Sequence, residues 1–456
     1  MNGKVKSKNF KWAVTIALVA FVSLGAAQVC ASDLKQAVEN ALSVHPSLKS
    51  AKAEEQAAEF GQKIEQSYLL PDIKVRAEGG RIFQDNATSR GLSVTRGDAY
   101  SNFGLGSVGL YQTLFDGNEA RNRIDAAQLR KQSLSYNFLD VEQNLILGVA
   151  QTYIDIIRIR TALDILHHQN KSVEGYKKRI ADMIESGGAD EAELQQATDV
   201  QMLVKSTRAD YEGQLLAAEA SYRELTGQNP NENLEKPLSA KSQIIADIEG
   251  AITQAKAQHP LLMSAHTQAA ATASEVDAEK ATVYPDLTGE LSYLQSTKRD
   301  VIGGKVTDAR ALLKLNWNFS TGKRGNAAID QKRQEQAVAQ ARAEQTEKQI
   351  ERDIYQAYAT YNTFKKKRDI AADRVTLNKD LLKSYELQFE GARISLLTLM
   401  RAQSQLFNAM LEYNDNDFFV MSAEYNILAM TGALKPVILR AETTKTENVA
   451  KTSDVQ

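Results

Sequence analysis

The sequence predicts a mainly α-helical chain that also contributes four strands to a transmembrane β-barrel, and three observations predict this fold class. The chain is a tandem duplication, because its two halves match in order. Each half has a long proline-free stretch, between Pro71 and Pro230 and between Pro285 and Pro436, as very long helices require. Near the start of each stretch the apolar residues change to a period of two, which is typical of strands.

Residues 1–31 have the features of a secretory signal peptide. Four lysines precede an apolar run from Trp12 to Ala27, and the small-residue site Val29-Cys30-Ala31 follows. An uncleaved anchor helix is the alternative, but about 16 apolar residues fall short of the roughly 20 that span a bilayer. Cys30 is also a lipidation candidate, although Val29 stands where a lipoprotein signal prefers Gly or Ala. Cleavage after Ala31 removes the only cysteine, so disulfide and thiol chemistry are not expected.

Charge and hydropathy exclude two classes of protein for the mature chain, a nucleic-acid-binding protein and a helical membrane protein. The signal holds four lysines and no acidic residue, so the mature chain is four charges more negative than the −2 of the full sequence. This mild acidity gives no sign of nucleic-acid binding, which needs a basic face. No later stretch has the roughly 18 apolar residues of a membrane helix. A soluble exported helical protein and a β-barrel protein remain.

Two repeats follow the signal. His45-Pro46 and Pro71-Asp72 return as His259-Pro260 and Pro285-Asp286, and further along Tyr153 corresponds to Tyr358 and Thr226-Gly227 to Thr431-Gly432. We therefore expect a first repeat over residues 32–247 and a second over residues 248–436. Residues 437–456 are polar and are expected to form a flexible tail.

Four strands are expected, at about 72–84, 101–115, 286–294 and 309–319. Each is close to the length of about 10 residues that a tilted transmembrane strand needs. Their alternation assigns one set of side chains to a water-filled lumen, namely Lys74, Arg76, Glu78, Arg310, Lys314, Asn316 and Asn318. It assigns a second set to lipid, namely Phe103, Leu105, Tyr111, Phe115, Leu313, Leu315, Trp317 and Phe319.

A small soluble sheet with one wet face would alternate in the same way. However, the only layer that could cover four such strands is a set of helices far too long for the task, and an open sheet edge is not tolerated in lipid. Four strands are also too few to close a barrel, because the smallest have about eight. Copies of the chain must therefore pool their strands, and strand arithmetic alone allows two, three or four copies.

The long helices are expected within residues 118–227 and 323–431. The segment from Gly117 to Gly187 spans 70 residues, which is about 105 Å at roughly 1.5 Å per residue. Its apolar residues follow coiled-coil spacing, for example at Ile124, Ala127 and Leu134. Each long helix is expected to turn at a glycine and to return about half as far. The shorter helices at 46–69 and 260–283 then occupy the other half of its length.

The sequence resembles the TolC-like outer-membrane factors over nearly all of residues 34–432. The resemblance rests on the duplication, on Leu114-Phe115-Asp116-Gly117, and on Gln388-Phe389-Glu390-Gly391-Ala392-Arg393 followed by Ser395-Leu396-Leu397. It implies a homotrimer in the outer membrane of a Gram-negative bacterium, with a 12-stranded barrel and a 12-helix periplasmic tunnel. It also implies two partners, a periplasmic adaptor protein and an inner-membrane transporter.

The tip block is most similar to family members that serve type I protein secretion, in which the inner-membrane partner is an ABC transporter. A multidrug efflux duct, coupled to a proton-driven transporter, shares the architecture and remains the alternative. A third class, an exported coiled-coil adaptor or structural protein, would share the long helices without needing lipid-length strands.

The periplasmic tip departs from the family pattern. Family members commonly carry acidic residues in the returning tip helix, where this sequence reads Leu396-Leu397-Thr398-Leu399-Met400-Arg401-Ala402-Gln403. A cation-binding acidic ring is therefore not expected at Thr398 or Arg401. The first-half tip is acidic instead, and we hypothesise that Arg393 pairs with one of its acids to hold the periplasmic end closed. The tip and gate candidates are Asp182, Glu185, Gly187, Gly188, Asp190, Glu191, Glu193, Gly391, Arg393, Thr398 and Arg401.

The sequence offers no catalytic, cofactor-binding or metal-binding set. His45 and His259 stand at equivalent helix starts, which predicts a role near the helix cap rather than a ligand role. His167 and His168 are adjacent, so they point to different sides of a helix and do not form an i, i+4 metal pair. Neither a phosphate-cradling glycine loop nor a nucleophile elbow is present. The sequence therefore predicts a protein that is not an enzyme.

Overall fold

The two repeats have the same order of helices and strands in the computed structural model, which describes residues 34–83, 100–297, 305–318, 321–391 and 393–440. The predicted signal peptide lies outside these ranges. The first repeat contains α1 (Leu34–Val44), α2 (Pro46–Ser67), β1 (Asp72–Phe83), β2 (Tyr100–Phe115), α4 (Glu119–Glu185) and α5 (Glu191–Thr226). The second contains α6 (Ile248–Gln258), α7 (Pro260–Ala281), β3 (Asp286–Thr297), β4 (Lys305–Asn316), α8 (Arg324–Glu390) and α9 (Leu396–Met430).

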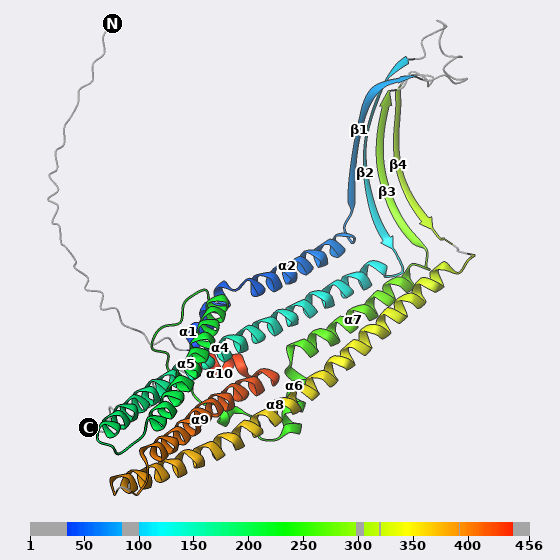
Figure 1. The fold of residues 1–456 in the computed structure, drawn as a ribbon. Coiled ribbons are helices and arrows are strands. Elements are labelled where there is room, and N and C mark those ends of the chain that lie inside the picture. Colours follow the sequence, from blue (N-terminus) through cyan, green and yellow to red (C-terminus); the bar gives the residue numbers. More distant parts are fainter. Residues whose placement is uncertain (1–33, 84–99, 298–304, 319–320, 392, 441–456) are drawn as a thin grey trace, which may run out of the picture.

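The helices α4 and α8 set the length of the molecule. Each has 67 residues, which corresponds to about 100 Å. Neither helix contains a proline, whereas Pro46 and Pro260 open α2 and α7, where the missing N–H is not needed. Figure 1 shows the sheet at one end of the helices and the turns of the two hairpins, α4–α5 and α8–α9, at the other. No helix in the described ranges is both long and apolar enough to cross a membrane.

The four strands form one antiparallel sheet in the order β1-β2-β3-β4. Three boundaries differ from the prediction in the second repeat: β3 runs on to Thr297, β4 begins earlier, at Lys305, and β4 ends earlier, at Asn316. Trp317 and Asn318 therefore follow the strand instead of continuing it. The Trp317 indole donates a hydrogen bond to the carbonyl oxygen of Val283, at 3.1 Å, where the chain leaves the sheet.

The helices form a wall one layer thick, and its order changes halfway along. Near the sheet, neighbouring helices follow the order α2, α4, α7, α8; toward the hairpin turns the order is α5, α4, α9, α8. The long helices α4 and α8 belong to both halves of the wall. The short helices α2 and α7 occupy the part of the length that α5 and α9 do not reach, as the sequence predicts.

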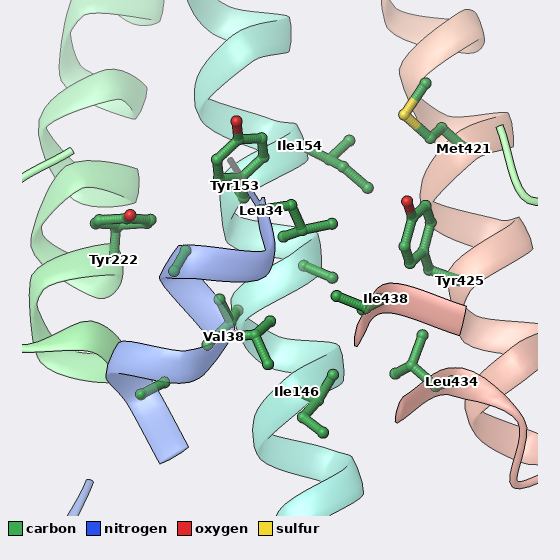
Figure 2. Close-up of a cluster of buried hydrophobic side chains, with 14 of the residues drawn as sticks. Leu34, Val38, Ile146, Tyr153, Ile154, Tyr222, Met421, Tyr425, Leu434 and Ile438 are labelled. Carbon is green, nitrogen blue, oxygen red and sulfur yellow. The ribbon is translucent and has the colours of Figure 1, made fainter. Parts of the chain in front are cut away.

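The largest hydrophobic core lies where the two halves of the wall meet. Leu34 and Val38 of α1 pack there against Ile146 and Tyr153 of α4 (Figure 2). The short helix α10 (Leu434–Arg440) joins the same core, with Ile438 only 4% exposed. The predicted flexible tail from residue 437 is therefore wrong at its start, because Ile438 gains burial by continuing the helix. Residues 441–456 lie outside the described ranges.

The segment that follows α5, residues 227–247, is bound to the wall through its backbone. The hydroxyl groups of three tyrosines donate to its carbonyl oxygens: Tyr153 to Glu235 at 2.9 Å, Tyr425 to Leu238 at 3.2 Å and Tyr358 to Ile245 at 2.6 Å. The buried Glu424 carboxylate accepts from the hydroxyl of Ser239 and from the backbone N–H of Ala240. These side chains satisfy the polar groups of a segment that has little secondary structure of its own.

Candidate functional site

The sheet has one polar face, which we define by the side chains that share a side with Lys74, Arg76 and Glu78. Residues paired directly across an antiparallel sheet point to the same side, and the pairing extends this face to Thr288, Glu290 and Ser292 on β3 and to Asp308, Arg310, Lys314 and Asn316 on β4. Ion pairs join Arg76 to Glu78, Arg310 to Asp308, and Lys314 to Glu290.

The opposite side is the apolar face, which carries Ile73 and Val75 on β1, Val108 and Leu110 on β2, Leu291 and Tyr293 on β3, and Leu313 and Leu315 on β4. Many of these side chains are exposed: Val75 by 77%, Leu313 by 73% and Leu315 by 64%. Exposed apolar surface on this scale marks a surface that meets lipid or another protein. The predicted alternation is therefore present on β1, β3 and β4.

The register contradicts the predicted split on β2. Glu78 pairs with Leu105, Gly80 with Phe103 and Asp72 with Tyr111, so these three large residues lie on the polar face and not on the side predicted for lipid. The Tyr111 ring lies over Gly109, where an added Cβ would come within 2.8 Å of it, and the Lys74 ammonium stands 5.1 Å from the ring centroid. The apolar-face residues of this strand are Val108 and Leu110, which share that face with Gly104 and Gly106.

Phe115 keeps the side predicted for it, because a bulge shifts the register after Thr113 and pairs Phe115 with Leu287 of the apolar face. Two further residues predicted for lipid or lumen are placed differently. Trp317 and Asn318 follow the end of β4 and belong to neither face of the sheet. Phe319 lies outside the described residues.

At the far end of the wall, the first hairpin turns through Ser186–Asp190. Gly187 has φ +76°, a conformation that favours glycine, and its N–H bonds to the carbonyl of Ile184 at 3.0 Å. Gly188 closes the turn with a 2.8 Å bond to the carbonyl of Met183. Asp190 caps α5, because its carboxylate accepts from the N–H of Glu193 at 2.9 Å. Among the predicted tip acids, Asp190 therefore has a structural role.

The second hairpin turns through residues 391–395 with different geometry. Gly391 has φ −82°, which any residue adopts. Ser395 caps α9, accepting from the N–H of Thr398 at 3.3 Å, so Thr398 lies in the first turn of that helix. The Arg401 guanidinium donates to the Gln196 side-chain oxygen at 3.3 Å and so joins the two hairpins at the same level. Buried side chains of both hairpins, including Ile180, Ala197, Leu396 and Met400, form a small core.

Arg393 and the tip acids do not meet in the single copy. Arg393 is exposed, and within the described residues no ion pair joins it to Asp182, Glu185, Asp190, Glu191 or Glu193. Its backbone N–H bonds to the carbonyl of Gln388 at 2.9 Å, which positions the turn. A lock made by Arg393 therefore requires an acid from a neighbouring copy or another arrangement of the tip.

A buried ionic cluster halfway along the wall was not predicted. The Arg158 guanidinium, in a side chain 9% exposed, contacts the carboxylates of Asp155 at 2.7 Å and Asp415 at 2.9 Å. Burial opposes its charge, but the hydrogen bonds and charges of Asp415 and Asp155 outweigh burial and raise the pKa of Arg158. Tyr211 donates to the second oxygen of Asp415 at 3.0 Å. The cluster joins α4, α5 and α9, and only the i, i+3 spacing of Asp155 and Arg158 was visible in the sequence.

The two equivalent histidines have different environments. His45 accepts a hydrogen bond from the N–H of Ser47 at 3.2 Å and thus caps α2, as predicted. His259 also stands at the N-cap, that of α7, but its side chain makes no capping bond. Burial lowers the pKa of His259, which is 6% exposed. In the described part of the chain, no group of three or more His, Cys, Asp or Glu residues is arranged to hold a metal ion.

Comparisons with known proteins agree with this architecture. The family model described as "Outer membrane efflux protein" matches residues 37–228 and 251–433, one match in each repeat. The outer membrane efflux protein BepC of Brucella suis is 24% identical over 350 residues, which are 74% of this chain and 73% of that protein.

Solved structures show the same fold. The structure of CusC has a TM-score of 0.77 at 15% identity and covers 88% of this chain and 92% of its own. The Campylobacter jejuni CmeC outer membrane channel has a TM-score of 0.74 at 17% identity, covering 88% and 86%. The outer membrane protein VceC of Vibrio cholerae has a TM-score of 0.75 at 15% identity, covering 88% and 96%.

The family match covers most of the chain and both repeats, so it favours a channel over a coiled-coil adaptor and over an enzyme. Channels of this family are trimers whose strands line an outer-membrane barrel, whose helices form a periplasmic tunnel, and which work with periplasmic adaptors and inner-membrane transporters. The chain belongs to the outer membrane efflux protein family, as an outer-membrane channel of a tripartite export system.

Proposed function

We propose that this channel serves type I secretion, in which an ABC transporter and a periplasmic adaptor pass polypeptides from the cytoplasm through the channel to the outside. The observation that carries the proposal is the second hairpin tip, where Gln388–Glu390 ends α8 and Ser395 opens α9. Adaptors must engage the periplasmic end of such a channel, and this block resembles family members that work with secretion transporters.

The two faces of the sheet support the proposed placement in the membrane. In this arrangement the apolar face meets lipid and the polar face lines the lumen. In the sheet described here β1 and β4 each pair on one side only, and free edges are not tolerated in lipid. Pairing β4 of one copy with β1 of the next removes both edges, and three copies give a barrel of twelve strands with room for a lumen.

The charge pattern of the polar face supports passage of polypeptides. Its charges are of both signs and are largely paired with one another, as in Arg76–Glu78 and Lys314–Glu290. A wall with paired charges stays wet but has no strong field that would trap cargo of one sign. The exposed Leu312, together with Leu105 and Phe103 on the same face, adds apolar contacts that unfolded segments tolerate.

Multidrug efflux is the second candidate, with a proton-driven transporter as the inner-membrane partner. It is favoured by the name of the curated relative, an outer membrane efflux protein, which is 24% identical to this chain.

Deletion of the gene separates the two candidates when two properties of the same strain are measured. We expect loss of one or more secreted proteins from the medium, unchanged drug susceptibility, and recovery of secretion when the wild-type chain is restored. Increased drug susceptibility with an unchanged set of secreted proteins would contradict type I secretion and support efflux.

We also propose that Arg393 takes part in closing the periplasmic end, through acids of a neighbouring copy. Conductance of Arg393→Ala in planar bilayers tests this, with Lys383→Ala on the exposed side of α8 as the matched control. The proposal predicts more frequent opening for Arg393→Ala than for the wild type and the control. Equal opening of all three proteins would show that Arg393 does not hold the gate.

A further inference from the structure

The wall of one copy has two long edges, and the same two sides are free along the whole molecule. The sheet ends in β1 on one side and β4 on the other. Near the sheet, the outermost helices of the wall are α2 and α8. Toward the hairpin turns, they are α5 and α8. One edge is thus made by β1, α2 and α5, and the other by β4 and α8. A ring of identical copies closes only when these unlike edges meet.

The free side of α5 carries an apolar and charged pattern that its own copy leaves uncovered. Met202, Ala209 and Leu216 are spaced by seven residues and are exposed, Met202 by 55% and Leu216 by 68%. Met202 stands two residues from the buried Val204, or about 200° around the helix, so this stripe points away from α4. Lys205 and Glu212 alternate with it, completing the 3–4 spacing of a coiled-coil seam.

The free side of α8 carries a matching pattern. Ile370 and Leu377 are seven residues apart and are exposed by 59% and 67%. Lys366 and Asp373 alternate with them at the same 3–4 spacing and are exposed as well. Asp373 stands two residues from the fully buried Ala371, so this seam points away from α9.

We infer that α5 of one copy packs antiparallel along α8 of the next copy, with Met202 on Leu377, Ala209 on Ile370, Lys205 facing Asp373 and Glu212 facing Lys366. The inference rests on the proposed channel, in which copies form a closed ring. One register satisfies all four pairs, because each step of seven along α5 is matched by a step of seven in the opposite direction along α8. Displacing the helices by half a heptad would place Leu377 on Lys205 and Asp373 on Ala209.

The heights of the residues agree with this register. The bond from Arg401 to Gln196 holds the two hairpin tips of one copy at the same level along the ring axis. Rotation about that axis generates the next copy and leaves this level unchanged, so positions along α5 and α8 can be compared between copies. Met202 lies 11 residues above the start of α5, and Leu377 lies 13 residues above the end of α8. Lys205 and Asp373 lie 14 and 17 residues above the same ends. The paired residues thus differ in position along the axis by two or three residues, or roughly 3–5 Å. A tilt of the two helices relative to the ring axis, as in coiled coils, accounts for a difference of this size.

The charges of the seam are available to a neighbour. In the described residues of one copy, no ion pair involves Lys205, Lys366 or Asp373, and Glu212 pairs only along its own helix with Arg208. At a seam between copies the two charge pairs favour this register, because a shift by a whole heptad would bring together the like charges of Glu212 and Asp373 or of Lys205 and Lys366.

Disulfide cross-linking tests the seam directly in the full-length protein in membranes, with Cys30 replaced by serine. The pair Met202→Cys with Leu377→Cys is expected to form bonds between copies on oxidation and to give covalent dimers and trimers on non-reducing gels. The matched control, Asp210→Cys with Lys379→Cys, changes two exposed residues of the same helices that lie off the seam, and is expected to remain monomeric on the gel.

Charge exchange gives an independent readout. Lys205→Asp alone and Asp373→Lys alone are each expected to lower the midpoint temperature of trimer dissociation, and the double variant is expected to restore it. Failure of the double variant to recover, together with absence of the disulfide, would overturn the seam. If an amine cross-linker still captures trimers in that case, the copies associate but not through this seam. If it captures no trimers, the proposed channel is contradicted as well.

Discussion

Tyr153 and Tyr358, which the duplication relates, bind the same connecting segment from two different helices. The hydroxyl of Tyr153 on α4 donates to the carbonyl of Glu235, and that of Tyr358 on α8 donates to the carbonyl of Ile245. Both rings are buried, Tyr153 completely and Tyr358 with 4% exposed. The duplicated residue thus binds the segment that follows α5 at two points, at Glu235 near its middle and at Ile245 near its end.

Removing either hydroxyl is expected to loosen this segment. Tyr153→Phe and Tyr358→Phe each leave a carbonyl without its donor, at a cost of about 1 kcal/mol. Limited proteolysis within residues 227–247 should therefore be faster in both variants than in the wild type. The control is Tyr413→Phe, whose ring is 39% exposed and whose hydroxyl makes no described bond. Equal cleavage of all variants would mean that the tyrosines do not hold the segment.

The ionic cluster around Arg158 predicts a loss of stability at alkaline pH. Burial, then the charge and hydrogen bond of Asp415, raise the pKa of Tyr211 to about 12. Because this pKa is higher in the folded protein than the value of about 10 expected after unfolding, the stabilisation is complete below pH 10 and is lost as the pH rises from 10 to about 12.

Tyr211→Phe removes this titrating group. Unfolding midpoints at pH 9 and pH 11 should therefore differ less in Tyr211→Phe than in the wild type, whereas Tyr413→Phe should behave like the wild type. An unchanged pH dependence in Tyr211→Phe would show that Tyr211 keeps an ordinary pKa in the folded protein.

The register of β2 predicts opposite outcomes for two neighbouring substitutions. Val108→Lys places a charge on the apolar face and is expected to cost about 2–4 kcal/mol near the middle of a bilayer. Leu105→Lys places the same charge beside Glu78 on the polar face and is expected to be tolerated. The amount of assembled protein in outer-membrane fractions measures both. If Val108→Lys assembled normally and Leu105→Lys did not, the assignment of the two faces to lipid and lumen would be the wrong way round.

The two hairpin turns differ in their need for glycine. Gly187→Ala forces a non-glycine residue to φ +76°, at a cost of roughly 1–2 kcal/mol. Gly391→Ala meets no such cost, because its φ is −82° and the nearest atoms would lie 3.6 Å from the new methyl group. Proteolysis at the hairpin tips should accelerate in Gly187→Ala only. Acceleration in both variants would show that Gly391 also depends on its small size.

The sequence predicted the architecture because the strongest local signals are repeated and unambiguous. Pro46 and Pro260 open helices, Pro71 and Pro285 mark the change from period 3.6 to period 2, and the long proline-free stretches that follow Pro71 and Pro285 contain α4 and α8. The tip glycine Gly187 was also found from sequence, since the left-handed turn needs it.

Features that depend on contacts between distant residues were not predicted correctly. The faces of β2 were misassigned because the large apolar side chains of Phe103 and Leu105 suggested that their side was the apolar one. The pairing of β2 with β1 determines the two faces, and this pairing is not visible in the sequence of β2 alone. The helix α10 looks like a polar tail until Ile438 meets the core of α1 and α4. Arg158 and Asp415 are more than 250 positions apart, so their pairing exists only in the folded chain.

The central claim is that copies of this chain combine their strands to complete an outer-membrane pore. The direct measurement is the protein mass of the mature chain extracted from outer membranes in detergent, by light scattering with the detergent contribution subtracted. The account predicts three times the mass of a single mature chain. A mass of one chain, or full recovery of the protein in aqueous extracts without detergent, would contradict it.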